Sequence, residues 1–366
     1  MKFKSSENKS AFTLVELLVV IAIIGILTTI AVVALNNARA KARDAKRVAD
    51  IKQVQTALEL FFNDNNRYPT AAEFNSGSLF STSSLGTTTY MAAIPNTPGP
   101  ADGNCDAQYD QYIYSASDNG ATYNLSFCLG GATGSLAAGG SCATVAGFSS
   151  EFCPCNENTI CGLHCFYDGQ KYNTVTIGTQ CWFQNNLNAG TMILGSVTQG
   201  DADGGNIEKY CYNDDEAYCS TDGALYAWHT AMALPETCDN HDGTAPCVVG
   251  TPHQGICPSG WHIPSDSEWH TLELGFATST CDPARDGQGC VPAGDELRVG
   301  GSSGFNGLLA GVRTSVFGWR NSYGYHWSSA LQSNTRSVLR NIPLDSYVAR
   351  SYGDKINEIS VRCLKD

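Results

Sequence analysis

An almost uninterrupted apolar run near the amino terminus constrains this chain more than any other feature. From Leu14 to Leu35 the only charged residue is Glu16. Twenty-two residues at a rise of about 1.5 Å each make a helix of about 33 Å. The hydrocarbon core of a bilayer is about 30 Å thick, so this helix can span it. Three lysines precede the run, and the positive-inside tendency places that end in the cytoplasm.

The helical pattern continues beyond the apolar run. Apolar residues recur at spacings of three and four from Ala38 to Phe61, with basic residues at other positions. Asn65, Asn66 and Pro69 end the pattern. We therefore predict one long helix that is apolar all round in its first half and amphipathic in its second half, which packs on a small head.

The start of this helix resembles the N-terminal methylation motif of type IV pilins and type II secretion pseudopilins. The resembling residues are Ala11, Phe12, Thr13, Leu14, Val15 and Glu16, followed by the apolar run and its basic continuation. The resemblance implies that a prepilin peptidase cuts between Ala11 and Phe12 and methylates the new amine of Phe12. The mature chain then polymerises through the helix. The family usually has Gly before the cut, whereas this chain has Ala11.

The same resemblance offers a reason for Glu16. A lone carboxylate in hydrocarbon is costly and is kept mainly where it gains a partner. Cleavage creates such a partner, the positive amine of Phe12 on a neighbouring subunit. The alternative is that Glu16 lies at the membrane interface, where the dipole of the helix start favours it. The two can apply in succession, and we predict Phe12 and Glu16 as assembly residues.

Charge and cysteine content limit the functions that the rest of the chain can have. Residues 1–149 carry 10 basic and 11 acidic residues, whereas residues 150–366 carry 12 and 24. Nucleic-acid binding needs a basic surface, so it is not expected of the acidic second half. The 16 cysteines favour disulfides in an oxidising compartment over metal ligands or catalytic thiols. Short-range candidates, which spacing alone does not fix, are Cys211 with Cys219, Cys238 with Cys247, and Cys281 with Cys290.

The segment after the helix is predicted to form the small head. Tyr109–Ala116 and Gly120–Leu129 alternate apolar and polar residues around a turn, which predicts a β-hairpin. Asp102 and Asp106 precede it, and Asp110 lies at its start. A calcium site is one reading of these acids, but we interpret them as solvated loop residues.

Two stretches separate this head from the second half of the chain. Gly130–Ser150 is rich in small residues without a lasting period, and we interpret it as a flexible linker. Cys153–Cys165 then packs four cysteines into 13 residues. Their spacing is not the paired CxxC of common zinc modules, so we favour a knot of two disulfides over a zinc site.

From Phe166 onward, short β-like runs rich in Gly, Trp, Tyr and Asn indicate a second domain. Within it, Ser265 and Glu268 form a capping box that predicts a helix start. His262 and His270 lack a zinc-binding arrangement such as HExxH, and we interpret them as structural.

Six ordered blocks of this region resemble the Fibrobacter succinogenes major paralogous domain. They are FYDGQKYNTVTIGTQCWFQNNL, KYCYNDDEAYCSTDGALYAWHTAMA, CPSGWHIPSDSEWHTL, GFNGLLAGVR, YHWSSA and VRCLKD. The resemblance implies a fold related to C-type lectin-like and formylglycine-generating-enzyme domains. It also implies a long-range disulfide between Cys257 and Cys363. The Glu-Pro-Asn and Gln-Pro-Asp triplets of calcium-dependent lectins are absent from the sequence.

Aromatic residues are the candidate ligand contacts of this domain. Exposed members can stack on sugar rings, although tryptophans in such a domain are more often core residues. The candidates are Trp228, Trp319, Tyr323, Tyr325 and Trp327.

The predicted fold class is α+β: a long N-terminal pilin helix with a small antiparallel sheet head, then a disulfide-rich C-type lectin-like domain. The predicted segments are a leader (1–11), a transmembrane and amphipathic helix (12–66), a head with a β-hairpin (67–129), a Gly/Ser linker and Cys-rich connector (130–165), and the lectin-like domain (166–366).

The predicted function is a type IV pilin-like filament subunit, minor or at the tip, that displays its second domain for adhesion. Its expected partners are other pilin or pseudopilin subunits, the prepilin peptidase, the inner membrane before assembly, and an unknown surface or glycan ligand. We expect a single-pass protein of the cytoplasmic membrane that then joins an extracellular filament or the cell surface. The alternative is a type II secretion pseudopilin whose extra domain recruits substrates. An enzyme is disfavoured, since formylglycine-type chemistry needs free cysteines, and no catalytic residue, cofactor or metal is predicted.

Overall fold

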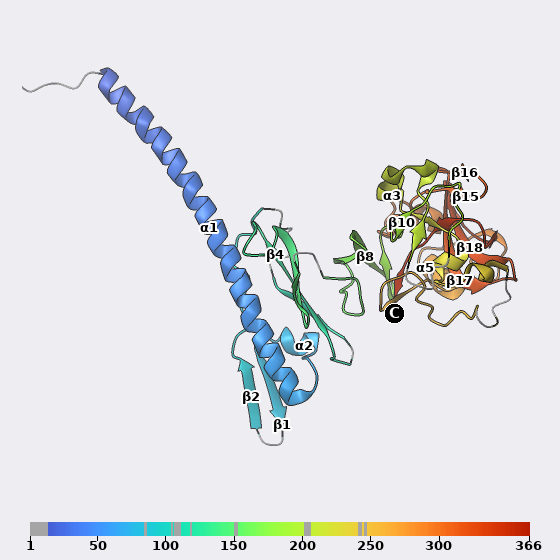
Figure 1. The fold of residues 1–366 in the computed structure, drawn as a ribbon, viewed down its shortest axis with the longest axis horizontal. Helices are drawn as coiled ribbons and strands as arrows, with labels where there is room; N and C mark the ends of the chain where they lie inside the picture. Colours follow the sequence, from blue (N-terminus) through green and yellow to red (C-terminus); the bar gives the residue numbers. More distant parts are fainter. Residues whose placement is uncertain are drawn as a thin grey trace, which may run out of the picture.

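The computed structural model describes residues 14–83, 86–103, 105, 111–117, 119–149, 153–200, 206–240, 244 and 247–366. Figure 1 shows a long helix, a small head packed against its second half, and a larger domain on the far side of the head. Helices and antiparallel strands occur together in the described parts, so the predicted α+β class is confirmed.

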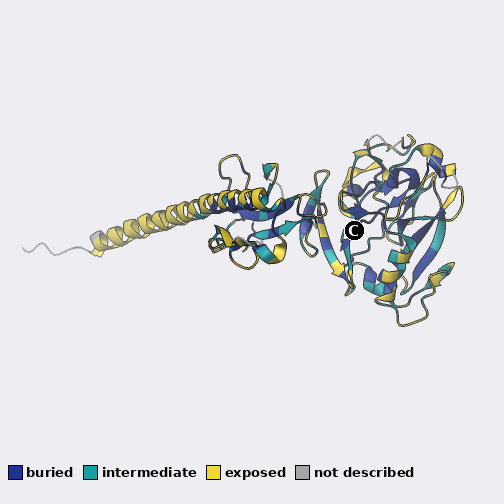
Figure 2. Ribbon diagram, turned by 90° about the horizontal axis from the view of Figure 1, so that it is seen from below, coloured by how far each residue is buried: buried dark blue, intermediate teal, exposed yellow. Residues whose placement is uncertain are grey.

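Helix α1 runs without interruption over Leu14–Asn65, as the sequence pattern predicted. Its first half projects from the head with apolar side chains exposed, whereas one face of its second half is buried (Figure 2). The buried residues include Ile51, Val54, Leu58 and Phe61, at the predicted spacing of three and four. In the described part of the chain, α1 is the one helix long and apolar enough to cross a membrane.

The head is a thin antiparallel layer against α1. Its described elements are α2 (Ala71–Phe74), β1 (Leu79–Ser83) paired with β2 (Gly86–Met91), and a sheet of β3 (Ile113–Ala116), β4 (Tyr123–Leu129), β5 (Gly139–Thr144) and β6 (Gly147–Ser149). Strands β3 and β4 form the predicted hairpin, with Ile113 opposite Ser126. Tyr109 and Asp110, where that hairpin was predicted to begin, lie outside the described residues.

Residues 130–149 correct the predicted flexible linker. They include β5 and β6, which extend the head sheet beyond β4. Ser141, Cys142 and Ala143 are fully buried, so the small side chains serve close packing. Gly147, the first residue of β6 after the turn, has a φ of 115°, a conformation that favours glycine. Small residues leave no hydrophobic period, which is why the pattern resembled a linker.

Two larger sheets form the described part of the C-terminal domain. The five-stranded sheet has the order β13 (Trp261–His262), β21 (Leu364–Lys365), β9 (Gln180–Phe183), β8 (Gln170–Ile177) and β7 (His164–Tyr167). The six-stranded sheet has the order β12 (Leu225–Tyr226), β20 (Ile359–Ser360), β17 (Tyr323–Leu331), β18 (Arg336–Pro343), β19 (Val348–Asp354) and β14 (Gly287–Gly289).

Short elements surround these sheets. The helices are α3 (Glu216–Asp222), α4 (Trp228–Ala231), α5 (Asp266–Leu274) and α6 (Ala293–Leu297), with 3₁₀ turns η2 (Tyr212–Asp214) and η3 (Glu236–Asn240). Two small strand pairs are β10 (Thr191–Met192) with β11 (Glu208–Lys209), and β15 (Val312–Arg313) with β16 (Phe317–Gly318). Helix α5 begins with the predicted capping box of Ser265 and Glu268.

Tryptophan dominates the core of this domain. All six tryptophans lie in the described residues, and five of them are fully buried: Trp182, Trp228, Trp261, Trp269 and Trp327. The sixth, Trp319, is 62% exposed. The aromatic core therefore accounts for all of the tryptophans except one.

Candidate functional site

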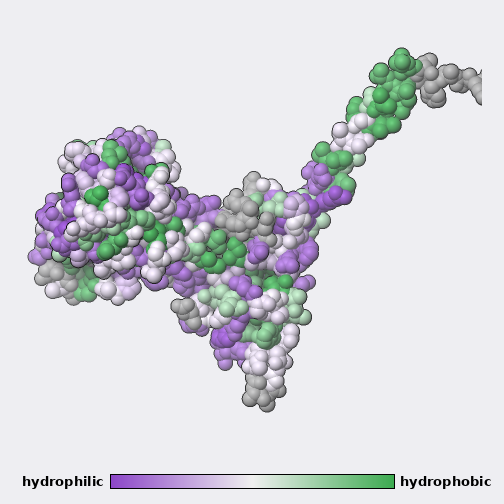
Figure 3. All heavy atoms as spheres, turned by 180° about the vertical axis from the view of Figure 1, so that it is seen from behind, coloured by the Kyte–Doolittle hydropathy of each residue, from purple (hydrophilic) through white to green (hydrophobic). Residues whose placement is uncertain are grey.

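The predicted processing residues, Ala11 and Phe12, lie outside the described residues, and so does the side chain of Glu16, although its backbone belongs to α1. The neighbouring apolar side chains are exposed, with Leu14 at 78%. Figure 3 shows a hydrophobic surface over the outer part of α1 that gives way to a hydrophilic one near the head. An apolar surface of this size needs lipid or other helices to cover it.

A cluster of ion pairs fixes α1 where it enters the head. The Arg43 Nε donates to Asp102 Oδ2 at 2.6 Å, and Arg47 Nη1 pairs with Asp44 at 2.6 Å. The carboxylate of Asp44 also accepts two backbone N–H bonds from residues 130–131. The hydrogen bond from Arg43 lowers the pKa of Asp102. Asp102 is therefore an ion-paired residue, which corrects its interpretation as a solvated loop acid.

The two other acids considered for calcium, Asp106 and Asp110, lie outside the described residues.

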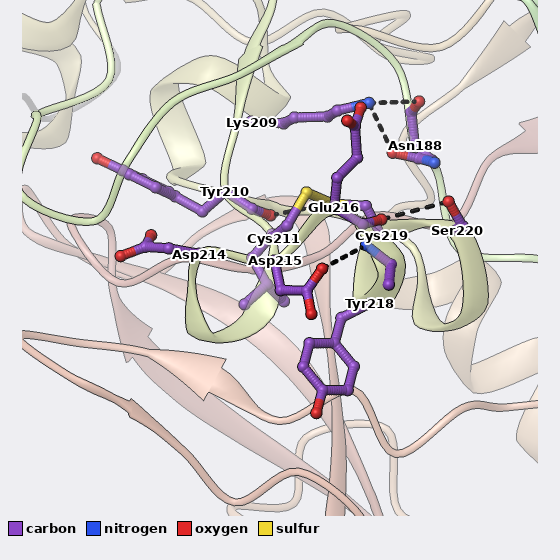
Figure 4. Close-up of a disulfide and its surroundings, with 12 residues drawn as sticks. Asn188, Lys209, Tyr210, Cys211, Asp214, Asp215, Glu216, Tyr218, Cys219 and Ser220 are labelled. Carbon is purple, nitrogen blue, oxygen red and sulfur yellow. Dashed lines mark hydrogen bonds between the residues drawn. A yellow bond between two sulfur atoms is a disulfide. The ribbon is translucent and has the colours of Figure 1, made fainter.

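Eight disulfides join the 16 cysteines, all of which lie in the described part of the chain. Four are the pairs expected from the sequence: Cys211–Cys219, Cys238–Cys247, Cys257–Cys363 and Cys281–Cys290. Figure 4 shows the first of these beside α3, with Asp215 capping that helix and the Tyr218 ring turned away from the sulfurs. The Cys257–Cys363 bond joins segments 106 residues apart and fastens the region of β13 to β21.

The predicted knot of two disulfides within Cys153–Cys165 is wrong. In this fully described segment, only Cys155–Cys165 closes locally. Cys153 bonds back to Cys142 in β5 of the head, and Cys161 bonds forward to Cys181 in β9 of the domain. Close spacing suggested local bridges, but it does not reveal that strands from both sides flank the segment. We call residues 153–165 the joint.

Polar contacts support the joint on both sides. From the head, Ser115 Oγ donates to the Asn158 carbonyl at 2.5 Å, and Asn124 Nδ2 donates to Asn156 Oδ1 at 3.1 Å. From the domain, Trp261 Nε1 donates to the Asn156 carbonyl at 3.3 Å. Sequence reasoning missed these residues. The available signal was the Asn-Glu-Asn run between cysteines, because asparagine side chains readily bond nearby backbone.

Two adjoining clefts lie in this region, and the larger of them borders the joint at Glu157. The larger, of about 650 Å³, is lined by Ser117, Asn119, Ala121, Thr122, Glu157, Ser259, Gly260, Lys365 and Asp366. The smaller, of about 300 Å³, shares Lys365 and Asp366 and is also lined by Thr251, Pro252, His262, Ile263, Ser265, Glu268 and Ser329. The chemistry of the smaller cleft depends on His262.

His262 is held between two carboxylates. Its Nε2 lies 3.0 Å from Glu268 Oε1, and its Nδ1 lies 2.6 Å from Asp366 Oδ1. Burial lowers the pKa of His262, but the bonds to Glu268 and Asp366 outweigh it and the net pKa is raised. Burial would raise the pKa of Glu268, yet His262 and the cap bonds from Ser265 lower it to about 2. Both ring nitrogens of His262 already contact carboxylates, so the ring is not placed to act as a base. His262 instead links β13, α5 and the residue that follows β21, and we call this group of His262, Glu268 and Asp366 the latch.

Among the described residues, His270 lies in a group of metal-ligand types with Glu273, Cys281 and Cys290, whose ligand atoms lie within 4.8 Å of one another. The two sulfurs are bonded to each other, and Glu273 pairs with the fully buried Arg340. These donors are thus already engaged, which fits the structural interpretation of His270.

The candidate aromatic residues separate into two groups. Trp228 and Trp327 are buried core residues. Trp319, Tyr323 and Tyr325 instead form a row, with successive ring centroids 5.6 and 5.8 Å apart. We call these three residues the aromatic row.

Comparisons with known proteins find relatives of the N-terminal segment. Residues 7–32 match the family model of the prokaryotic N-terminal methylation motif. Type II secretion system core protein G of Aeromonas hydrophila is 45% identical over 66 residues, covering 18% of this chain and 46% of that protein. The core protein G of Escherichia coli (strain K12) is 39% identical over 67 residues, covering 18% and 46%. The chain therefore spans about half the length of the curated relatives it matches.

The second family model covers the larger domain. Residues 175–365, just over half of the chain, match the Fibrobacter succinogenes major domain. No solved structure matches the chain significantly. The N-terminal segment is of the pilin and pseudopilin type, and the chain as a whole belongs to the Fibrobacter succinogenes major domain family.

Proposed function

We propose that this protein is a subunit of a type IV pilin-like filament and displays its C-terminal domain as a surface-binding, adhesive module. A prepilin peptidase processes it between Ala11 and Phe12, and other pilin or pseudopilin subunits are its partners through α1. Before assembly the chain is held in the cytoplasmic membrane by the apolar half of that helix. After assembly it lies in an extracellular filament or at the cell surface.

One structural relationship carries this proposal. The exposed apolar half of α1 projects from one side of the head, and the C-terminal domain is fastened to the opposite side (Figure 2). The Cys142–Cys153 and Cys161–Cys181 disulfides connect the joint to the head and to the domain. Assembly through α1 therefore leaves the domain free to meet a ligand.

A binding role is favoured over catalysis by the state of the reactive groups. Formylglycine-type chemistry uses free reactive thiols, whereas all 16 cysteines of the chain are paired. In the smaller cleft, both nitrogens of His262 are held by carboxylates. We therefore propose a domain that binds a ligand without transforming it.

The proposal is tested by expressing the tagged full chain with its native prepilin peptidase. Filaments are sheared from the cells and labelled with antibody to the C-terminal domain. We expect labelled filaments, and we expect cells that lack residues 166–366 of this chain to adhere less to surfaces. Absence of the protein from filaments, or unchanged adhesion, contradicts the proposal.

A second candidate function is a pseudopilus subunit of a secretion machine, whose extra domain recruits substrates. It is favoured by the curated relatives, which are type II secretion core proteins. In that case, loss of this chain leaves adhesion unchanged and causes exported proteins to accumulate in the periplasm. Comparison of the secreted and periplasmic proteins of the two strains separates the two functions.

A further inference from the structure

Trp319 combines two unfavourable features at one position. It is 62% exposed, whereas the other five tryptophans of the described chain are buried. Its backbone also has a φ of 64°, a left-handed conformation that bulky residues rarely adopt. Because the Trp319 ring is exposed, the chain gains no hydrophobic stabilisation from burying it. The positive φ adds backbone strain. Folding alone does not account for a tryptophan here.

The loop that carries Trp319 is nevertheless firmly held. The N–H groups of Ser322 and Tyr323 both donate to the Trp319 carbonyl at 3.1 Å. A Cβ atom on Gly311 would clash with the Gly318 carbonyl oxygen, so the backbones on the two sides of this loop are in close contact. The Trp319 ring is therefore presented by a fixed backbone.

The ring belongs to the aromatic row. Trp319 meets Tyr323 edge to face at an interplanar angle of 77°, and Tyr323 lies tilted by 30° to Tyr325. Tyr323 and Tyr325 lie two residues apart on β17, so they share one face of the six-stranded sheet. The row thus runs from the loop before β17 onto one face of the sheet at the start of that strand.

An unpaired acceptor lies next to this row. Asn341 on β18 is directly opposite Tyr325 in the antiparallel register, so the two side chains share a face. Its side-chain oxygen is buried and has no hydrogen-bond partner among the described residues. Such an atom is costly unless a donor reaches it. Because this oxygen has no exposed surface, a ligand lying along the row can supply that donor only when the Asn341 side chain turns toward the row.

Charge decides the class of ligand. Arg320 follows Trp319, but its guanidinium is paired with Asp222 and lies over the Tyr218 ring at 4.3 Å. Residues 150–366 carry 24 acidic against 12 basic residues, so a polyanion is repelled. The rings of the row have apolar faces and carry N–H or O–H groups at their edges. They suit a ligand that is flat and apolar on one side and rich in hydroxyls at its edge. A neutral pyranose chain has both properties.

We propose that the aromatic row of Trp319, Tyr323 and Tyr325 binds a neutral polysaccharide, whose sugar rings stack on the aromatic faces and whose hydroxyl donates to Asn341 once that side chain turns toward the row. This inference rests on the surface-binding function proposed above and names its ligand class and site.

The test uses the full chain in a polyoxyethylene detergent, because sugar-based detergents compete for such a site. Affinity electrophoresis measures retardation by neutral polysaccharides (hydroxyethyl cellulose, glucomannan and xyloglucan) and by acidic ones (polygalacturonate and alginate). The principal variant is Trp319→Asn, because asparagine tolerates positive φ and the change replaces the ring with a small amide. Tyr323→Leu is the second variant, and Ile356→Asn, at another exposed apolar side chain, is the matched control.

We expect a neutral polysaccharide to retard the wild-type chain, and both ring variants to bind it about tenfold more weakly or worse. The Ile356→Asn control should bind like wild type, and Trp319→Asn should unfold at the same temperature or higher. Unchanged binding by both ring variants overturns the site but leaves a surface-binding function intact. Stronger retardation by the acidic polymers overturns the neutral class. If no polysaccharide retards the wild-type chain, this inference is wrong. The adhesion assay of the full chain still tests the proposed function separately.

Discussion

Cys142 of the head and Cys153 of the joint are bonded to each other, with Cα atoms 4.8 Å apart. This bond lies where small residues suggested a flexible linker. Together with the hydrogen bonds of the joint, it restrains the orientation of the domain relative to α1.

Removing this bond should loosen the domain without unfolding it. In the Cys142→Ser, Cys153→Ser double variant, we expect a broader distribution of interdomain distances, measured by fluorescence energy transfer between labels on the head and the domain. The Cys238→Ser, Cys247→Ser variant is the matched control, because that bond lies within the domain. Equal distance distributions in the two variants would show that the remaining contacts suffice to hold the joint.

The Cys257–Cys363 disulfide should contribute more stability than any short-range bridge. By chain entropy, a loop of 106 residues is worth about 5 kcal/mol, whereas the 8-residue separation of Cys211–Cys219 is worth about 2.5 kcal/mol. The measurement is denaturant unfolding of the two Cys→Ser double variants under non-oxidising, non-reducing conditions. All six tryptophans lie between residues 182 and 327, so their fluorescence follows this domain alone. A larger loss for the short-range pair would contradict the entropic account.

Glu16→Ala should separate membrane insertion from assembly. The substitution makes the apolar segment more hydrophobic, so the chain should still enter the membrane fraction. Filament yield should fall strongly, because the amine of Phe12 loses its proposed partner in the neighbouring subunit. Glu16→Asp, which keeps the charge, is the control. Normal filament yield in Glu16→Ala would exclude the pairing.

The latch at His262 should make domain stability depend on pH. The pKa of His262 is raised in the folded state. The stability that His262 contributes is therefore complete below pH 6.5 and is lost as the pH rises through the folded-state pKa. Glu268 has a folded pKa of about 2 against an ordinary value of 4.5, so its contribution is complete above pH 4.5 and is lost on acidification. The latch is therefore strongest between about pH 4.5 and 6.5.

His262→Gln tests this window. We expect a loss of about 2 kcal/mol near pH 5.5, since the bonds replaced involve charged groups, and a smaller loss at pH 9. The free energy of unfolding of both proteins is measured by denaturant titration across this range. A loss that is constant with pH would mean that His262 acts by packing alone.

Local patterns predicted much of this fold. The spacing of Ile51, Val54 and Leu58 predicted the buried face of α1, and Ser265 with Glu268 predicted the start of α5. Both signals are local, since each depends on residues within one or two helical turns. The resemblance of the C-terminal blocks added the Cys257–Cys363 pair, which spacing alone does not give.

Features that depend on distant segments were not predictable. The fully buried Arg340 pairs with Glu273 and Asp266, about seventy residues away in the chain. The Cys142–Cys153 bond likewise depends on β5 lying in the head sheet. The site was partly predictable: Trp319 was one of five aromatic candidates, but its exposure and backbone conformation required the structure.

If the chain assembles and binds as proposed, the disulfide-restrained joint bears on how strongly the filament would hold a surface. With the orientation of each domain restrained by disulfides, helical symmetry would place the aromatic rows of successive subunits at regular intervals along the fibre. A long polymer lying across several rows is then bound multivalently, and each further contact forms at high effective concentration. In the proposed filament, weak individual sites would add up to lasting attachment, while a single subunit would detach readily and let the filament sample the surface.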